Sequence, residues 1–520
     1  MTATDKMMAD GFGKHRYFAP TIHLMSMGTG TGKTYFILYK LIPKALREGK
    51  RLLYLCNRTA LYSQVCRAID DACSDAVNGI SPMAGSYYGH NSPPAILVET
   101  YQRLESLISN GFDWIREWGY FDYIVADECH YFIQDTSFNP YTVLSFEAIF
   151  SQRCQIYCLS ATMDEFRALI CQRVSYCRTN AMYARDAFLH MEEHIIEDEF
   201  DGVDAVCFRE VSEIVSKINA SRKGEKWLIF VESKALARKL ADGIDKDTSI
   251  VTAADKNSQE FASITRQEKF DSEVMIATAV IDNGVNIKDL ELRNLVLMTS
   301  EKTEFLQMLG RKRRVSGEKV IVYIQALDKE LLQKRISRLT NLLDFGNQLL
   351  FQTPLVLIAD AAIRYSNDWR SRYFICHVFN RQTNLTAIVV NNLAVFHCQW
   401  LLNEYKEMLQ KIGEDPDMAF RIPLSWIKQE GGTEEVTCLS SIAAKLLDGM
   451  VGIEYTKKEL QEKLCEFVPI VIEFDKKLVQ NGRLSKKNFQ KYLERRYPEY
   501  VVFQHEASGR TQRYRLEKQE

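Results

Sequence analysis

The sequence predicts an α/β protein with two tandem parallel-sheet domains and a mainly helical C-terminal region. Through residue 330 of the 520-residue chain, short apolar runs alternate with helical stretches. This alternation is typical of parallel sheets whose strands are joined by helices. In chain order the expected strands are Ile22–Ser26, Leu52–Cys56, Ile96–Glu99, Tyr123–Ala126, Ile156–Ser160, Trp227–Val231, Val274–Ala277, Asn294–Met298 and Lys319–Ile324.

The strands fall into two series, which set the expected domain boundary. Residues 164–195 between the series are helical and then charged, leading into the run MEEHIIEDEFDG, and we interpret them as a connector. The first domain then covers residues 1–195 with its connector, and the second covers residues 196–330.

Residues 331–520 have a different pattern. Leucine and isoleucine recur near helical spacing at Leu332, Ile336, Leu339 and Leu343, so much of 331–470 is expected to be helical. This accessory region is a candidate wedge for strand separation, substrate-selecting module or platform for protein partners.

The final stretch, 476–520, carries twelve Lys or Arg against five Asp or Glu, with aromatic residues interleaved. Such a surface suits nucleic acid, but the rings could equally form the core of a small domain. The order of its patterns also fits a helix followed by a hairpin, as in a winged helix. The interleaved aromatic residues are Phe489, Tyr492, Tyr497, Tyr500, Phe503 and Tyr514.

Composition excludes several classes of protein. Hydrophobic residues make up 46% of the chain and charged residues 26%, which excludes a disordered or fibrous chain. The net charge of −2 excludes a uniformly basic coat protein, and no apolar run is long enough for a membrane helix. Thirteen scattered cysteines, including Cys154 and Cys158, are expected in the core of a reduced, cytoplasmic protein that does not engage a membrane.

The clearest chemical signal is the segment IHLMSMGTGTGKTYFIL, in which a strand leads into a glycine-rich loop and then a helix. Backbone N–H groups of such a loop, aided by the helix N-terminus, wrap a phosphate. Lys33 is expected to reach the β- and γ-phosphates, and the Thr34 hydroxyl to ligate Mg²⁺. The loop residues expected to hold the nucleotide are Gly28, Thr29, Gly30, Thr31, Gly32, Lys33 and Thr34.

A second signal lies ninety-four residues after Lys33, in FDYIVADECHYF. Its apolar strand ends in Asp127 and Glu128, at the edge of a parallel sheet where ligands bind. Asp127 is expected to hold Mg²⁺ through its water shell, and Glu128 to orient and deprotonate the attacking water. We interpret Cys129 as a small packing residue, and no ligand cluster supports a metal role for His130.

Together these segments resemble motifs of superfamily 2 helicases of the DExH type, within the DEAD/DEAH-box helicase family. GTGTGKT, DECH and Ser160-Ala161-Thr162 resemble motifs I, II and III. NRTAL (57–61) and TYQRL (100–104) resemble motifs Ia and Ib. WLIFVESK (227–234), ATAVIDNGVNI (277–287) and QMLGRKRR (307–314) resemble motifs IV, V and VI, so the resemblance covers about residues 20–325.

The resemblance implies a fold and a role for each matching position. It implies two RecA-like domains with ATP and Mg²⁺ in the cleft between them. Arg311 and Arg314 would act as arginine fingers, and Gln307 would contact the nucleotide or water near His130 and Glu128. Asp282 and Gly284 would line the cleft, Ser160 and Thr162 would couple cleft closure to strand movement, and Arg58, Thr100 and Thr278 would touch the nucleic-acid backbone.

Two positions depart from the family motifs, and a third departs from a regular helix. Met27 stands where the first glycine of the P-loop pattern is usual, and Asn57 stands where proline is common in motif Ia. Pro43 interrupts the helix after the P-loop and is expected to kink it. Residues 12–23 carry no convincing glutamine-bearing adenine motif, which disfavours a DEAD-box RNA chaperone.

The leading functional hypothesis is an ATP-dependent helicase that moves along or unwinds nucleic acid, with DNA weakly favoured over RNA because no RNA-specific module is evident. One alternative is a nucleic-acid-stimulated ATPase that translocates without separating strands. A third, of another class, is an inactive nucleic-acid-binding scaffold. The intact Lys33, Asp127, Glu128 and Arg314 argue against it.

Overall fold

The computed structural model describes most of the chain. The described residues are 1–12, 20–28, 30–57, 62, 65–69, 94–179, 189–196, 200, 202–252, 264, 267–278, 287–314, 318–351, 368–427, 446–474, 478–480, 483–507 and 511–518.

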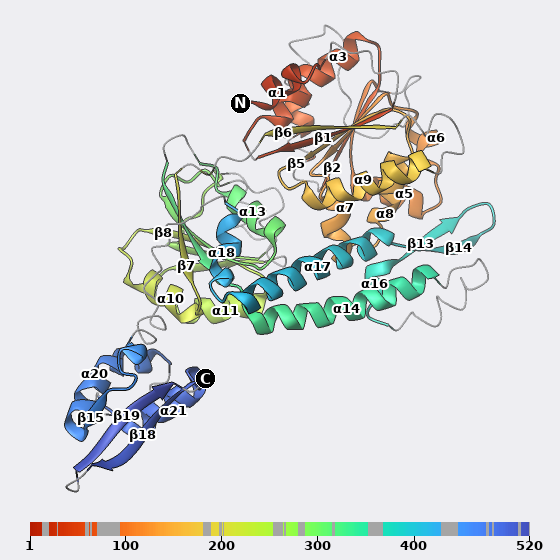
Figure 1. Ribbon diagram of the computed structural model, residues 1–520. Coiled ribbons are helices and arrows are strands. Elements are labelled where there is room, and N and C mark those ends of the chain that lie inside the picture. The colour runs from red at the N-terminus through yellow and green to blue at the C-terminus, as the bar shows by residue number, and fades with distance from the viewer. Residues whose placement is uncertain are drawn as a thin grey trace.

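The first domain is built on a parallel six-stranded sheet of order β3-β2-β4-β5-β1-β6 (Figure 1). All five predicted strands are present. The sequence pattern did not predict β6, because most of its residues were assigned to the charged connector. β6 lies at the sheet edge, where charged side chains are tolerated because one side of the strand is open. The strands are β1 (Thr21–Met27), β2 (Leu52–Cys56), β3 (Ile96–Thr100), β4 (Tyr123–Asp127), β5 (Gln155–Ser160) and β6 (His190–Ile196).

Helices cover both faces of this sheet and bury two separate apolar clusters. One face packs under α1 (Ala3–Ala9), α2 (Lys33–Phe36), η1 (Ile37–Leu41) and α3 (Ile42–Arg47). The other packs under α5 (Tyr101–Ser109), α6 (Trp114–Trp118), α7 (Tyr131–Gln134), η2 (Asp135–Ser137), α8 (Thr142–Phe150) and α9 (Asp164–Thr179). Cys154 and Cys158 are buried in this second cluster, which confirms the prediction of core cysteines at both positions.

The second domain has its own parallel six-stranded sheet, of order β7-β12-β11-β8-β10-β9. The four predicted strands of this series are present, and the sequence missed β7 and the short β9. Together the two sheets confirm the α/β class with tandem RecA-like domains. The elements are β7 (Val203–Phe208), α10 (Val211–Ala220), β8 (Lys226–Val231), α11 (Lys234–Ala241), β9 (Thr248–Val251), β10 (Val274–Ala277), β11 (Leu292–Met298), α13 (Lys302–Arg311) and β12 (Val320–Gln325).

A helical arm runs beside both domains (Figure 1). The predicted helix with Leu332 and Leu343 is present as α14, and α17 packs along it. Near its start α17 adds Leu393 to the first domain's core, and further along it adds Leu401 and Tyr405 to the second domain's core. The arm comprises α14 (Lys329–Phe351), α16 (Ser371–Phe374), β13 (Ile375–Asn380), β14 (Leu385–Val390), α17 (Asn392–Glu414) and α18 (Met418–Ser425).

The chain ends in a small domain with a core of its own (Figure 1). Phe489, Tyr492, Tyr500 and Tyr514 are buried in that core, whereas Phe503 is exposed. Most of the interleaved rings are therefore structural, and the predicted helix followed by a hairpin is present as α21, β18 and β19. The elements are β15 (Glu454–Thr456), α20 (Lys457–Phe474), β16 (Val479–Gln480), β17 (Arg483–Leu484), α21 (Lys486–Arg496), β18 (Tyr500–Ala507) and β19 (Thr511–Lys518).

Within the described ranges, no helix combines the length and apolar character that a membrane crossing requires.

Candidate active site between the two sheets

The loop after β1 has the backbone geometry of a phosphate-binding loop. Gly30 and Gly32 have φ angles of 86° and 88°, a region that glycine enters without steric cost. Gly32 caps α2, so the N-terminus of that helix opens directly from the loop. The Lys33 ammonium donates to the carbonyl oxygens of Met27 and Gly28, the latter at 3.0 Å, and so lies within the loop.

The helix after the loop accommodates Pro43 without ending. Between α2 and α3 the chain forms one wide turn, η1, with a π-helical pattern, and Pro43 lies in the first turn of α3. A wide turn is a known way for a helix to absorb a residue that cannot donate a backbone hydrogen bond. Apolar side chains of this segment, Phe36, Ile37 and Leu41, remain fully buried against the sheet.

The acidic pair lies where β4 ends. Only β5 separates β4 from β1 in the sheet, so the acidic pair and the phosphate-binding loop share one edge. Asp127 is buried, and burial together with the neighbouring charge of Glu128 raises the pKa of Asp127 to about 6. Its carboxylate accepts hydrogen bonds from the Tyr54 hydroxyl at 2.6 Å and from the Glu128 backbone N–H at 3.0 Å.

Glu128 follows the last residue of β4, and its side chain is partly exposed. Its φ angle of 50° is uncommon for a residue with a side chain, and it leaves the Glu128 side chain 35% exposed. Burial alone would raise the pKa of Glu128, but the positive charges of His130 and Lys33 outweigh it. Arg311 and Arg313 from the second domain lower that pKa further. Glu128 is therefore held as a carboxylate.

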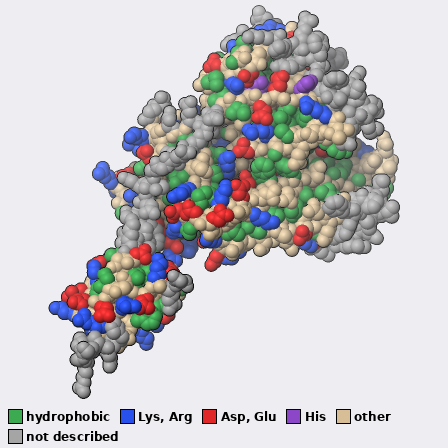
Figure 2. Space-filling model, viewed as in Figure 1, with side chains coloured by type: hydrophobic (Ala, Val, Ile, Leu, Met, Phe, Trp, Pro, Cys, Tyr) green, Lys and Arg blue, Asp and Glu red, His purple; other side chains and the backbone are tan. Residues whose placement is uncertain are grey.

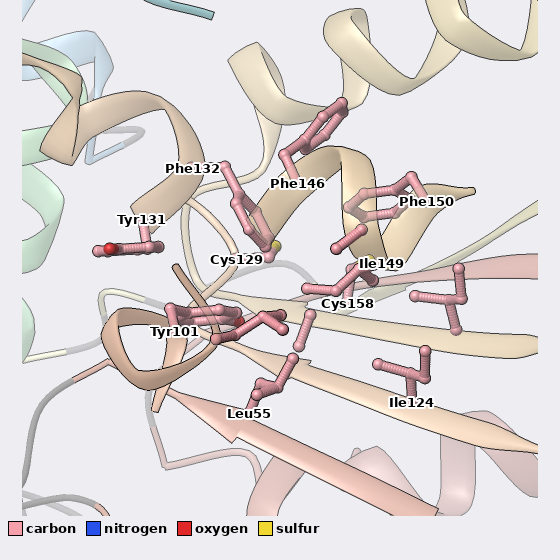
Figure 3. Close-up of a cluster of buried hydrophobic side chains, with 14 of the residues drawn as sticks. Leu55, Tyr101, Ile124, Cys129, Tyr131, Phe132, Phe146, Ile149, Phe150 and Cys158 are labelled. Atoms are coloured by element: carbon pink, nitrogen blue, oxygen red, sulfur yellow. The ribbon is translucent and has the colours of Figure 1, made fainter. Parts of the chain in front are cut away.

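Buried aromatic side chains of α5, α7 and α8 form a cluster on one face of the first domain's sheet (Figure 3). The Tyr101 hydroxyl donates to the Asp127 backbone oxygen at 2.9 Å, and its ring stacks on Tyr131 with centroids 4.7 Å apart. Cys129 is fully buried beside these rings and donates its backbone N–H to Leu159 of β5. Cys129 therefore packs, as predicted.

His130 links the acidic pair to the segment after β5. Its Nδ1 lies 3.0 Å from the Ser160 hydroxyl and 3.4 Å from a Glu128 carboxylate oxygen. Ser160 also donates to the Thr162 carbonyl and accepts from the Thr162 N–H, at 2.8 and 3.0 Å. A short chain of polar contacts therefore runs from Thr162 through Ser160 and His130 to Glu128.

Basic residues of the second domain face Glu128 from the end of α13. Beyond Arg311 the chain is extended and pairs with Ile287, which donates to the Arg311 carbonyl and accepts from the Arg313 N–H. Arg311 is the last residue of α13 and Arg313 lies just beyond it, and the positive charges of both act on Glu128. Lys312 between them is fully buried, bonded to Glu318 at 2.6 Å.

Two other residues of this motif have contacts of their own with the protein. Gln307 donates to the Gln134 side chain at 2.9 Å, so it contacts α7 one helical turn beyond His130. The Arg314 guanidinium lies 5.9 Å above the Phe200 ring, near the segment that joins the two sheets. Among the basic residues of this motif, Arg311 and Arg313 lower the pKa of Glu128, and no role for Arg313 was predicted from the sequence.

The remaining predicted residues are only partly described. Thr100 caps α5 by accepting from the Arg103 N–H at 3.1 Å, and Thr278 is buried after β10 with its N–H bonded to Val251. Thr34 is exposed in the first turn of α2. The predicted positions Thr29, Arg58, Asp282 and Gly284 lie outside the described residues.

A glycine-rich loop that opens a helix, an acidic pair at the same sheet edge and arginines from a second parallel sheet define a two-domain P-loop nucleoside triphosphatase. Family models agree with this class: residues 16–169 match the DEAD/DEAH box helicase domain, and residues 208–316 match the helicase conserved C-terminal domain. The chain belongs to the superfamily 2 DEAD/DEAH-box helicases, and it is an ATP-dependent helicase or ATPase.

Solved structures of this family resemble the chain at low sequence identity. One is S. cerevisiae Dbp5 bound to RNA and ADP BeF3, at 14% identity and a TM-score of 0.41, with 62% of this chain and 86% of that chain covered. Another is a DEAD box protein from the hyperthermophile Methanococcus jannaschii, at 17% identity and a TM-score of 0.32, with 62% and 89% covered.

Proposed function

We propose that the chain hydrolyses ATP between its two parallel-sheet domains and uses the cycle to move along or unwind nucleic acid. The observation that carries this proposal is the convergence of charge on Glu128, with Lys33 from the phosphate-binding loop and Arg311 and Arg313 from the other domain. A nucleotide held by both domains favours the closed cleft, and its hydrolysis releases that constraint.

Each group has a role that follows from phosphoryl transfer. Lys33 moves from the Met27 and Gly28 carbonyls to the β- and γ-phosphates of the bound nucleotide. Glu128, held as a carboxylate, orients the attacking water and accepts its proton. Arg311 and Arg313 stabilise the charge that develops on the transferred phosphoryl group, which is the largest demand of this reaction.

The residues present also fit Mg²⁺. The buried Asp127 carboxylate and the Thr34 hydroxyl offer hard oxygen ligands, and the raised pKa of Asp127 shows that its charge lacks full compensation from the protein. When bound, the ion neutralises charge on the β- and γ-phosphate oxygens. We assign Thr34 and Asp127 to that ion.

Coupling to the nucleic acid runs through the remaining motif residues. The contacts joining Thr162, Ser160 and His130 to Glu128 connect the hydrolytic centre to the segment after β5. Thr100, Thr278 and Arg58 are the assigned backbone contacts, which carry no sequence information. The sequence-based preference for DNA has no support among the described contacts, so the proposal takes both DNA and RNA as tracks.

Strand displacement tests the proposal. Labelled duplexes with single-stranded tails, of DNA and of RNA, are incubated with the full chain, Mg²⁺ and ATP, with Glu128→Gln as the hydrolysis-deficient control. Release of a strand by the wild type alone supports unwinding. ATP-dependent movement without release, measured by displacement of streptavidin from a biotinylated strand end, would identify a translocase instead. Absence of both activities would contradict the proposal.

A further inference from the structure

A polar cluster lies between β1 and the edge strand β6 of the first domain, at residues that have no assigned role in nucleotide binding. His23 is on β1, and Glu192 and His194 are on the neighbouring edge strand β6, where His23 pairs with Glu192 in register. His23 and His194 are almost completely buried, at 0% and 3% exposed. One ligand atom from each of the three side chains lies within 4.8 Å of the others.

The spacing of these atoms fits a tetrahedral metal centre. His23 Nδ1 lies 3.2 Å from His194 Nε2 and 3.3 Å from a Glu192 carboxylate oxygen. Zinc binds imidazole nitrogen and carboxylate oxygen at about 2.0–2.2 Å, so two ligands of a tetrahedral site lie about 3.3–3.4 Å apart. The two separations from His23 Nδ1 are therefore close to those between ligands of one metal ion, and the third pair of ligand atoms lies within 4.8 Å.

Each histidine has one ring nitrogen that faces away from the cluster, and this outer nitrogen contacts an oxygen acceptor. Metal-binding histidines usually have such a partner. His194 Nδ1 lies 2.6 Å from an Asp10 carboxylate oxygen, and His23 Nε2 lies 3.0 Å from the Gln155 amide oxygen. In the tautomers that donate to these two oxygens, the inner nitrogens, His23 Nδ1 and His194 Nε2, present lone pairs to a metal ion. A carboxylate or carbonyl behind each histidine fixes its tautomer and ring orientation in metal centres.

Packing holds the first ring in place. His23 stacks on Tyr157 of β5 with ring centroids 4.4 Å apart and an interplanar angle of 14°. Its ring plane is therefore set by the sheet, as a ligand on a rigid element requires.

We propose that His23, Glu192 and His194 bind one Zn²⁺ ion, with water as the fourth ligand. The ion would join the strand that leads into the phosphate-binding loop to the strand that leads into the second domain. Asp10 brings the end of α1 into the same centre, and α1 is itself bonded to the loop through the Ala3 N–H and the Thr31 carbonyl at 2.8 Å. The site is structural and lies beside the ATP-binding loop without being part of it.

Metal content of the purified full chain tests the site. We expect about one zinc per chain by mass spectrometry, and absorption bands of tetrahedral Co²⁺ after exchange. His194→Gln and Glu192→Gln should lose the zinc and these bands. The matched controls His190→Gln and Glu193→Gln, on the same strand, should keep both, because His190 is exposed and Glu193 pairs with Arg167 at 3.2 Å.

A milder variant keeps the test decisive if a ligand variant fails to fold. Asp10→Asn retains all three ligands and should weaken zinc binding by about 10- to 100-fold in a chelator competition, because it removes the carboxylate that accepts from His194. Lys6→Gln, which removes the other partner of Asp10, should leave zinc binding unchanged. A wild-type chain that takes up neither Zn²⁺ nor Co²⁺ would overturn the proposal and leave the cluster as a chain of hydrogen bonds. If His190→Gln loses as much zinc as the ligand variants, the proposal is overturned as well, because the zinc would then be bound adventitiously at the surface.

Discussion

At the scale of single residues, the side on which a side chain emerges decides which basic residues act in the site. Residues 311–314 are all Arg or Lys, and their spacing matched a family pattern that points to Arg311 and Arg314. In the structure the charges of Arg311 and Arg313 act on Glu128, while Lys312 between them is buried against Glu318. The run of basic residues predicted that this segment belongs to the active site. Which of these residues lie near Glu128 depends on the local backbone conformation.

This difference leads to a prediction about hydrolysis. Arg313→Ala should lower kcat for ATP hydrolysis by about 10³-fold, the effect expected when an arginine that stabilises transferred charge is removed. Arg314→Ala should have a clearly smaller effect, because the Arg314 guanidinium lies over Phe200. Steady-state hydrolysis assays on the two variants check this, and a larger loss in Arg314→Ala would restore the assignment drawn from the motif.

At the scale of elements, the sequence predicted best those strands that are buried on both faces. Strand β2, for example, is buried at every position, and its apolar run was recognised without ambiguity. Strand β6 was missed because its edge position admits His, Glu and Ile in mixed order. The aromatic residues of the terminal domain could not be assigned either, because a ring available for stacking and a ring in a small core have the same sequence pattern.

Helix α17 is tied to the first domain by an ion pair whose strength depends on pH. His397 Nδ1 lies 2.7 Å from the buried Glu165 carboxylate. Burial opposes the charge on His397, but the charge and hydrogen bond of Glu165 outweigh it and raise the pKa of His397 from 6.5 to about 9. The pKa of His397 is higher in the folded protein than in the unfolded chain. The ion pair therefore stabilises the fold fully below pH 6.5, and this stabilisation is lost as the pH rises through about 9.

We therefore expect the free energy of unfolding of the full chain to fall between pH 6.5 and 9.5 by an amount on the order of 3 kcal/mol, and its melting temperature to fall with it. His397→Gln should remove this part of the pH dependence, whereas His377→Gln, at an exposed position of β13, should leave it intact. Melting curves at a series of pH values measure both, and identical slopes for wild type and His397→Gln would contradict the assignment.

The terminal domain also supports a prediction at this scale. Lys487, Lys491 and Arg495 are exposed at four-residue spacing on α21 and form one basic stripe. Figure 2 shows Lys and Arg side chains on the surface of this domain, interspersed with acidic ones. A stripe of this kind suits a nucleic-acid backbone.

Changing the three stripe residues to glutamine should weaken nucleic-acid binding. It should also reduce the slope of log affinity against log salt by about 2 to 3, since each neutralised phosphate contributes about 0.7–0.9. Lys457→Gln and Lys458→Gln, at exposed positions of α20, serve as the control. An unchanged salt slope in the stripe variant would show that nucleic acid does not bind this face.

At the scale of the whole molecule, the helical arm constrains the cleft that the active site needs. The start of α17 is fixed to the first domain, where the Asn391 amide donates to the Pro140 carbonyl at 2.9 Å and to the Thr142 hydroxyl at 3.2 Å. Further along, Leu401 and Tyr405 of the same helix belong to the second domain's core. One rigid element therefore spans both domains, and cleft movement must bend or release it. The helical pattern of 331–470 was predictable, but this span was not, because it depends on which domain each turn of α17 contacts.

The central claim is a nucleotide site shared by two domains and coupled to nucleic acid. Its most direct test is the rate of ATP hydrolysis by the full chain with and without single-stranded DNA or RNA. Lys33→Ala is the inactive variant, and Lys40→Ala, an exposed lysine on the following turn, is the control. We expect hydrolysis that at least one polymer stimulates, that Lys33→Ala abolishes and that Lys40→Ala retains. Hydrolysis that depends on Lys33 but responds to neither polymer would contradict the coupling, and hydrolysis that survives in Lys33→Ala would contradict the site itself.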